Sequence, residues 1–466
     1  MMKNSRYRSA AAGRVRGAIC ERPCMWLSSL LVTLLAAGFL GSNAHAQQLP
    51  MRASLQLPDF TKQKVIPPGT KISAENWQQY KDYMSPALQT MFAGVTKWTV
   101  PPGYTIEVGP THDLSHAASK LYLDSTEKLG MQVKLVKLPT GGYSVEGYSV
   151  GMPFPNPQEP DMGIKIYYNN YYRYRPWLQF GHFDGYQIDR YFNRTRLYTN
   201  AVLMEHAHIA DPGMPQTLPG GDFYTQILEI LEPEQSRYTA SLQIFPDDPT
   251  KIDELYAFIP ALRRSLRLST AARCAPLLGT DLTNDDGGQG VTMVASTITA
   301  EFLGKQKLLS LVNLDRKSIA TREDFERTFI MPYGWPKPEA GTWEVRDVYV
   351  IDVQRLPQDR PGYCYGHRIM YLDADTFNLL AQDIYDANGR LWKYQDNLFP
   401  ILEAPDKSGN KLIGTDLFRV LRFYDLQNEH ATLGPFVNFQ SDTDVPAPYN
   451  DPVRWGSPAG LQQIMK

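Results

Sequence analysis

Three groups of residues have types and spacings that could support catalysis or metal binding. Gly147-Tyr-Ser149-Val-Gly151 matches the G-x-S-x-G pattern of a serine nucleophile. In a hydrolase this pattern lies where a strand ends, the chain turns sharply at the serine, and a helix follows. The N-terminus of that helix supports the oxyanion. Here the run Pro153-Phe-Pro-Asn-Pro157 follows at once, and such a run cannot start a productive helix. A hydrolase that uses Ser149 is therefore only an alternative hypothesis.

Four histidines have spacings that could place two metal ligands on one face. His206 and His208 would share one face of a strand, but no third ligand is evident. His112 and His116 have helical spacing, although the helix expected here begins only near Ser115. Hydrogen-bonded or exposed histidines are the simpler interpretation, so the sequence predicts no metal site.

Charged residues also gather around one predicted strand, at Lys337, Glu344, Arg346, Asp347 and Asp352. Paired carboxylates act as acid and base only at a set separation, which a sequence does not reveal. Surface ion pairs near strand ends are the ordinary interpretation. Walker, Rossmann, zinc-finger and kinase motifs are absent from the sequence. We therefore expect no catalytic residues, no cofactor and no enzymatic activity.

The elements that would position these residues are mainly strands. Residues 343–395 predict a β-meander, with Asn388-Gly389 as a two-residue type I′ turn. Its first strand is apolar on both faces, with Val348 and Val350 on one and Tyr349, Ile351 and Val353 on the other. An antiparallel strand over a single core has one polar face. A second layer or a ligand must therefore cover the other side.

The rest of the chain predicts short strands, with helices concentrated before residue 175. Residues 47–70 are proline-rich and extended, and residues 72–94 and 115–130 contain helical segments. Residues 161–175 predict a further helix that carries Tyr168 and Tyr171. Asp285-Asp-Gly-Gly-Gln-Gly290 predicts a flexible loop.

The N-terminus predicts export. Six basic residues precede the apolar run Met25 to Leu40, and Ala44-His-Ala46 fits a signal-peptide cleavage site. Without residues 1–46, which hold these six basic residues and one acid, 41 basic and 48 acidic residues remain. No basic block survives that could bind a phosphate backbone, so nucleic acid is excluded as an expected partner.

Two cysteines, Cys274 and Cys364, remain after cleavage. In an oxidising compartment they could form a disulfide, worth about 4–5 kcal/mol in the chain-entropy model. Two buried free thiols are the alternative.

The chain resembles the family known as domain of unknown function 1329. The residues that carry this resemblance cover nearly all of the expected mature chain: Gly151–Pro157, Asn169–Arg175, Glu254–Arg264, Gly279–Asp286, Trp343–Ile351, Tyr371–Phe377 and Tyr385–Trp392. The segment Tyr256–Arg264 is also similar to a passage of the periplasmic lipoprotein carrier LolA.

The resemblance implies a mainly β (α+β) fold, an open half-barrel of one large, curved antiparallel sheet, LolA-like, with helices covering its concave face. It also implies a periplasmic protein that acts with a resistance–nodulation–division type transporter and an outer-membrane partner. We expect a signal peptide at 1–46, a segment at 47–130 packing on the sheet, and a half-barrel domain at 131–466 of one or two sheet halves.

Together these observations predict a periplasmic carrier or chaperone for a lipid or another hydrophobic molecule. An acyl chain gains roughly 0.8 kcal/mol for each buried methylene, so such a carrier needs no catalytic group. A structural adaptor of a transporter without cargo is the main alternative. The predicted ligand-binding residues are Tyr168, Tyr171, Tyr349, Ile351, Val353, Trp392 and Tyr394.

Overall fold

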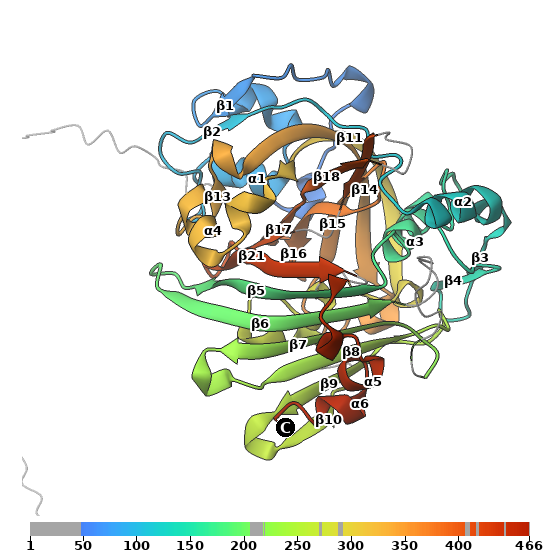
Figure 1. Cartoon of the computed structure of the whole chain (residues 1–466). Helices are drawn as coiled ribbons and strands as arrows, with labels where there is room; N and C mark the ends of the chain where they lie inside the picture. The colour runs from blue at the N-terminus through green and yellow to red at the C-terminus, as the bar shows by residue number, and fades with distance from the viewer. Residues whose placement is uncertain are drawn as a thin grey trace, which may run out of the picture. The chain divides into compact units, whose positions relative to one another are not determined.

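In the part of the chain that the computed structural model describes, 13 strands form one antiparallel sheet (Figure 1). The described residues are 48–205, 218, 220–269, 273–287, 292–405, 411–415, 419–441 and 444–465. The predicted signal peptide lies outside them. The sheet is not closed, because its end strands β10 and β11 do not pair. The mainly β fold with a large open sheet, predicted from the sequence, is confirmed.

The sheet has a single continuous strand order. Its strands are, from one edge to the other, β10 (Arg264–Arg267), β9 (Glu254–Ile259), β8 (Ala240–Pro246), β7 (Asp222–Glu232), β6 (Arg194–Glu205), β5 (Leu178–Ile188), β21 (His430–Ser441), β20 (Val420–Asp425), β17 (Leu391–Leu398), β16 (Leu379–Tyr385), β15 (His367–Asp373), β14 (Gly341–Arg355) and β11 (Ile298–Leu314).

Smaller elements surround this sheet. Four two-stranded pairs are β1 (Lys71–Ser73) with β2 (Thr105–Glu107), β3 (Lys134–Lys137) with β4 (Tyr143–Glu146), β12 (Phe329–Ile330) with β13 (Trp335–Pro336), and β18 (Ile401–Pro405) with β19 (Lys411–Thr415). The α-helices among the described residues are α1 (Pro86–Phe92), α2 (Lys120–Leu129), α3 (Met162–Tyr171), α4 (Arg322–Thr328), α5 (Pro452–Trp455) and α6 (Pro458–Leu461). None of the helices in these described ranges has the length and hydrophobicity needed to span a bilayer.

The last strand of the chain joins two runs of strands. Strands β5 to β10 follow one another along the chain, and the other half of the sheet consists of β11, β14, β15, β16, β17 and β20. Strand β21 pairs with β20 on one side and β5 on the other. Gly185 and Gly434 meet at this joint, where a Cβ on Gly434 would collide with the Gly185 backbone. Two glycines therefore allow the two sheet halves to form one sheet.

The predicted meander corresponds to β14, β15, β16 and β17. The predicted type I′ turn is wrong, because only Gly389 of the pair has a positive φ, at 75°. Asp386 uses its carboxylate to accept the N–H groups of Asn388 and Arg390, at 2.9 and 3.0 Å. The Gly389 N–H also donates to the Asp386 carbonyl. An aspartate-capped turn with one left-handed glycine therefore replaces the two-residue turn.

One face of the sheet packs against the N-terminal segment, residues 48–110. Leu88 and Met91 of α1 belong to the same hydrophobic core as Val348 and Val350 of β14. Ser85 caps α1, since its hydroxyl accepts the Leu88 N–H at 3.2 Å. The part of this segment around α1 lies against the orange strands in Figure 1.

The other face of the sheet, which we call the plug face, packs against α3 and against residues 273–287. Ile164 and Tyr168 of α3 share a second core with Ile351 and Val353 of β14. The two apolar faces of β14 are therefore both explained by packing within the protein. Helices cover both faces of the sheet rather than one alone.

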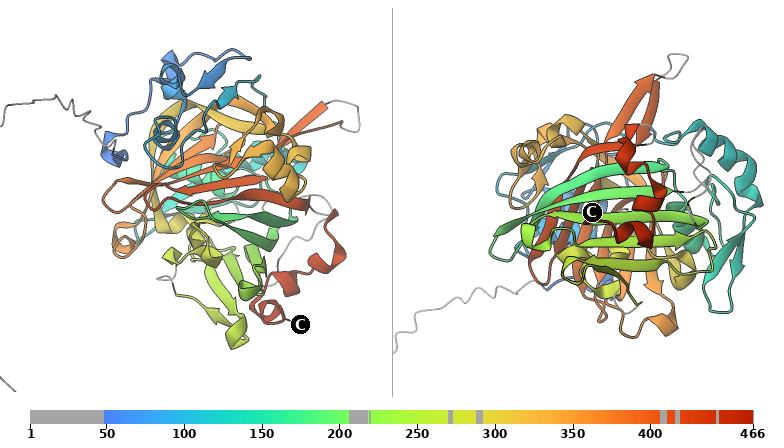
Figure 2. Two further views of the ribbon diagram at one scale, coloured as in Figure 1. Left: turned by 90° about the vertical axis from the view of Figure 1, so that its left-hand side faces the viewer. Right: turned by 60° about the horizontal axis from the view of Figure 1, so that its bottom comes forward.

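The C-terminal helices cover part of the first sheet half. Trp455 of α5 and Leu461 of α6 form a third core with Ile227 of β7 and Leu242 of β8. Figure 2 shows α5 and α6 lying across the green strands, and β18 with β19 projecting away from the sheet.

Candidate functional site

Five of the seven predicted ligand-binding residues lie together on the plug face. Tyr168, Tyr171, Tyr349, Ile351 and Val353 belong to or pack against the core that α3 forms with β14. Tyr349 stacks on Phe377, with ring centroids 5.5 Å apart. Burial raises the pKa of Tyr171 well above its ordinary value. These side chains are packed against protein atoms.

The other two predicted residues lie elsewhere. Tyr394 packs against Tyr424 in the core of the N-terminal segment, with ring centroids 6.3 Å apart. Trp392 donates its indole N–H to Asp425 at 2.9 Å. Trp392 and Tyr394 lie on β17, where alternation shows which residues share a face but not which layer of the protein covers that face. The sequence could therefore not show that these two residues lie apart from the other five. As ligand contacts, all seven residues stay predictions.

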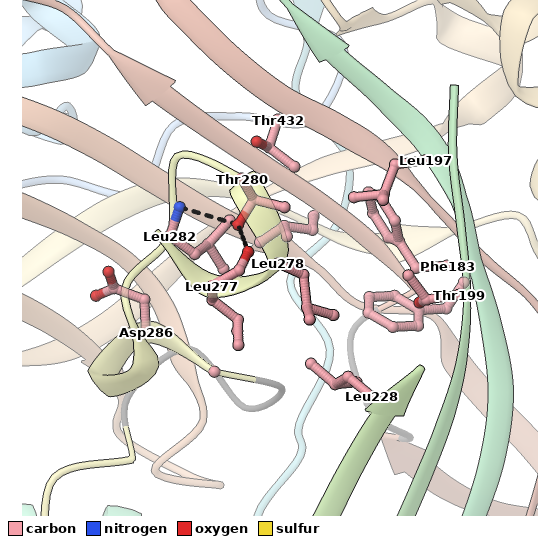
Figure 3. Close-up of a pocket in the computed structure, with 13 residues that line it drawn as sticks. Phe183, Leu197, Thr199, Leu228, Leu277, Leu278, Thr280, Leu282, Asp286 and Thr432 are labelled. Carbon is pink, nitrogen blue, oxygen red and sulfur yellow. Dashed lines mark hydrogen bonds between the residues drawn. The ribbon is translucent and has the colours of Figure 1, made fainter. Parts of the chain in front are cut away.

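The structure shows instead an apolar cavity on the plug face of the sheet (Figure 3). About 60 Å³ of it is open to the centres of water-sized molecules. None of the seven predicted residues lines it. Its walls come from β5, β6, β7, β20, β21 and residues 277–287: Phe183, Leu197, Thr199, Leu228, Leu277, Leu278, Thr280, Leu282, Asp286, Gly287, Leu421, Thr432 and Phe436.

Residues Arg273–Gly287, which we call the plug segment, form one wall of the apolar cavity. Leu277 donates its N–H to the Leu282 carbonyl at 2.7 Å, which closes a tight loop. Leu278 and Gly279 have positive φ angles of 51° and 78°, as the reversal requires. The Thr280 hydroxyl donates to the Leu277 carbonyl and accepts the Leu282 N–H, as Figure 3 shows. The loop therefore presents three leucines to the cavity.

Asp285 fixes the plug segment to the sheet through buried charges. Its carboxylate accepts from Arg273 at 2.8 Å, Arg355 at 2.5 Å and the Tyr363 hydroxyl at 2.6 Å. Burial alone would raise the pKa of Asp285, but the guanidinium groups of Arg355 and Arg273 outweigh it and hold the pKa well below its usual range. Arg273 also pairs with Asp253, so the charges are neutralised within the fold.

Asp286 makes a second set of bonds, to β15 and the segment before it. Its carboxylate accepts from Arg368 at 2.5 Å and from the Tyr365 hydroxyl at 2.8 Å. Burial raises the pKa of Tyr365 well above its ordinary value, so this hydroxyl stays a donor. The flexible loop predicted at 285–290 is therefore wrong at Asp285 and Asp286, which are fully buried and hydrogen-bonded; residues 288–290 lie outside the described ranges.

Cys274 and Cys364 form a disulfide, with Cα atoms 5.6 Å apart. Cys274 follows Arg273 at the start of the plug segment. Cys364 lies between Tyr363 and Tyr365, whose hydroxyls donate to Asp285 and Asp286 of the plug segment. One covalent bond and two buried ion-pair sets therefore hold the same piece of chain.

The structure does not assemble the serine-nucleophile site that the alternative hypothesis requires. Ser149 is exposed in the connection that follows β4, and the next helix, α3, begins only at Met162. A serine elbow needs a helix directly after the serine. The G-x-S-x-G match is therefore a chance pattern in a connecting segment.

The histidine pairs likewise form no metal site in the described ranges. His112 precedes α2 and bonds Glu344 at 2.6 Å through Nδ1. His206 and His208 lie outside the described residues. Within those residues, no group of three or more histidine, cysteine, aspartate or glutamate side chains could hold a metal ion.

Four of the five charged residues predicted around β14 form ion pairs, several of them buried, whereas Lys337 donates to the Arg327 carbonyl at 2.6 Å. Arg346 bonds Asp373 at 2.8 Å and Asp375 at 3.0 Å. Asp352 pairs with Arg52 at 2.7 Å, which ties the N-terminal segment to β14. Surface pairing is therefore the wrong description for Arg346 and Asp352, whose side chains are buried.

Comparison with known proteins gives a family without a described function. The model of the family described as protein of unknown function, DUF1329, matches residues 71–453. An uncharacterized protein of Pseudomonas aeruginosa is 23% identical over 372 residues, which cover 76% of this chain and 73% of the relative.

Two solved structures are similar to this chain, at low sequence identity and low TM-score. A DUF1329 family protein from Desulfovibrio piger has 13% identity and a TM-score of 0.42, covering 63% of this chain and 98% of that one. A LolA superfamily protein from Nitrosomonas europaea has 13% identity and a TM-score of 0.34, covering 60% and 92%. At these scores the likeness carries no argument about the site.

Proposed function

Because the chain belongs to the DUF1329 family, whose description names no function, we propose a function from the site: the protein carries a hydrophobic molecule, whose apolar part it binds in the apolar cavity. The observation that supports this proposal is the lining, in which leucine and phenylalanine side chains predominate. Among the described lining residues, Asp286 carries the one charged side chain, and Arg368 neutralises it.

The size of the cavity limits what enters without movement. A volume of about 60 Å³ corresponds to about four to six waters, since each water needs about 10–15 Å³ by this measure. The end of an alkyl chain fits this space, whereas a longer chain has to displace Leu277, Leu278 or Leu282. Each methylene buried contributes roughly 0.8 kcal/mol, which offsets such a rearrangement as the chain lengthens.

The cellular location and the partner proteins proposed for this carrier rest on the sequence. The N-terminal signal pattern and the family resemblance support a periplasmic carrier for a lipid or acyl chain. They also support action with an export system of the resistance–nodulation–division type and an outer-membrane partner. Native mass spectrometry of the exported protein, followed by organic extraction, is the direct test for a bound lipid.

A bulky side chain in the cavity wall should block binding. Thr199 of β6 is buried in the wall, so Thr199→Phe fills the space that a ligand would use. We expect the affinity for decan-1-ol, measured by calorimetry, to fall at least about tenfold, which corresponds to roughly two buried methylenes.

Thr195→Phe is the matched control, because Thr195 is an exposed threonine on the same strand. It should leave decan-1-ol binding unchanged. Equal loss in both variants, or no loss in Thr199→Phe, would show that the apolar cavity is not the binding site.

The small volume of the cavity favours one second candidate, an adaptor that docks to an envelope transporter and holds no cargo. This candidate predicts a clean protein mass without adducts, no decan-1-ol binding, and capture of a transporter. Adducts that disappear in Thr199→Phe would exclude it.

A further inference from the structure

Thr199 of β6 places a hydroxyl in the wall of the apolar cavity. The residue is 4% exposed and lines the cavity beside Leu197, which lies two positions earlier on the same face of the strand. Within the described residues this hydroxyl has no hydrogen-bond partner, and none of the dashed lines in Figure 3 reaches it. A buried hydroxyl without a partner is unfavourable, so a ligand oxygen that bonds it gains affinity.

The neighbours of Thr199 on this face of the sheet explain why its hydroxyl stays unbonded. Phe183 of β5 and Ile230 of β7 pair with Thr199 directly. Leu197 and Ala201 lie two positions before and after it on β6. Threonine hydroxyls in sheets often bond a threonine or serine on the next strand, but all four of these neighbours are apolar.

The other threonine hydroxyls of the described lining already have partners. The Thr280 hydroxyl donates to the Leu277 carbonyl and accepts the Leu282 N–H. The Thr432 hydroxyl donates to the Asp281 carboxylate at 2.9 Å and accepts the Asp281 N–H at 3.1 Å. Among the threonines that line the cavity in the described ranges, Thr199 therefore has the hydroxyl that remains for a ligand.

The charged side chain of the described lining is also engaged within the protein. The Asp286 carboxylate accepts from Arg368, from the Tyr365 hydroxyl, and from the N–H and the hydroxyl of Thr283. Among the described lining residues, no unpaired charge is therefore offered to a ligand. Because a buried charge is costly unless it is paired, the part of the ligand inside the cavity is expected to be uncharged.

We infer that the part of the ligand held in the apolar cavity is a neutral aliphatic chain with a hydroxyl or carbonyl oxygen, and that this oxygen bonds the Thr199 hydroxyl. Alcohols, ketones and esters share such an oxygen, which accepts the Thr199 O–H while the alkyl part contacts the leucines of the plug segment. The Thr199 hydroxyl also accepts a proton from an alcohol. This inference rests on the proposed carrier function and adds to it the chemical class of the cargo.

The test compares octan-1-ol, octan-2-one and octane on the purified protein, with the free probe measured by headspace gas chromatography. Thr199→Val replaces the hydroxyl with a methyl group. It should weaken the binding of octan-1-ol and octan-2-one about fivefold, as expected for one neutral hydrogen bond, and should not weaken the binding of octane.

Thr199→Ser keeps a hydroxyl at this position and should restore most of the affinity for octan-1-ol and octan-2-one. Thr195→Val is the matched control, because Thr195 is exposed on the same strand, and it should change the binding of none of the three probes.

The other outcomes separate this inference from the carrier proposal. In Thr199→Val, an equal fall for all three probes, or no fall for any, overturns the hydrogen bond to Thr199 and leaves the carrier proposal standing. A fall for octan-1-ol alone supports the inference and restricts the class to alcohols. Octanoate that binds the parent as tightly as octan-1-ol overturns the uncharged class. Failure of the three probes and of decan-1-ol to bind the parent overturns the carrier proposal itself.

Discussion

Replacing Asp285 with asparagine should lower the free energy of unfolding by about 3–5 kcal/mol, the usual cost of breaking a buried ion pair from one side. The Asp285 carboxylate is fully buried and accepts from Arg273, Arg355 and Tyr363. Asparagine keeps the shape of the Asp285 side chain but removes its negative charge. Arg355 then stays buried beside a neutral amide, whereas Arg273 still has Asp253.

Urea unfolding followed by circular dichroism measures this change. Asp359→Asn is the control, because Asp359 is exposed and should change stability by less than about 0.5 kcal/mol. An unchanged midpoint in Asp285→Asn would mean that the plug segment is not held by this carboxylate. The same variant should also alter decan-1-ol binding, since the plug segment forms one wall of the apolar cavity.

The second large effect depends on pH and comes from Asp383 of β16. Its buried carboxylate accepts the Ser85 hydroxyl at 2.8 Å and the Ala87 N–H at 3.3 Å, both at the start of α1. Burial raises the pKa of Asp383 to about 7, and the bonds from Ser85 and Ala87 oppose this rise only in part. Within the described residues no basic side chain pairs with it.

A raised pKa in the folded state means that folding favours the protonated acid. The stability contributed by Asp383 is therefore fully present below about pH 4 and is lost as the pH rises to about 7. A pKa that folding raises from 3.8 to about 7 corresponds to about 4 kcal/mol of stability. Asp383→Asn should thus be more stable than the parent by up to about 4 kcal/mol at pH 8, with little difference at pH 4.

Unfolding curves at both pH values separate this prediction from a simple packing effect. Asp359→Asn should show no pH-dependent difference from the parent. A constant offset between Asp383→Asn and the parent at pH 4 and pH 8 would show that folding does not raise the pKa of Asp383.

The strands could be predicted from the sequence because local signals define them. Alternating apolar residues and turn residues gave β14 to β17, and the helical segment expected within residues 72–94 contains α1. The type of the turn at Asn388-Gly389 could not be predicted from that pair alone. It depends on the carboxylate of Asp386, two residues earlier.

The apolar cavity could not be predicted, because its walls come from distant parts of the chain. Leu197, Leu277 and Leu421 are unremarkable in sequence and meet only through the β5–β21 pairing. The sequence did contain one indication that the acids of the plug segment are buried. Arg355 and Arg368 are basic residues inside strands with buried neighbours, and such positions require buried acids such as Asp285 and Asp286.

The pairing of β5 with β21 also constrains the order in which this chain folds. Synthesis delivers β5 long before residues 430–441, so the first sheet half has to wait with one strand edge unpaired. Such an edge can pair with other chains and cause aggregation. The sheet is complete only when the last strand has arrived, which favours a chain kept unfolded until its C-terminal part is available.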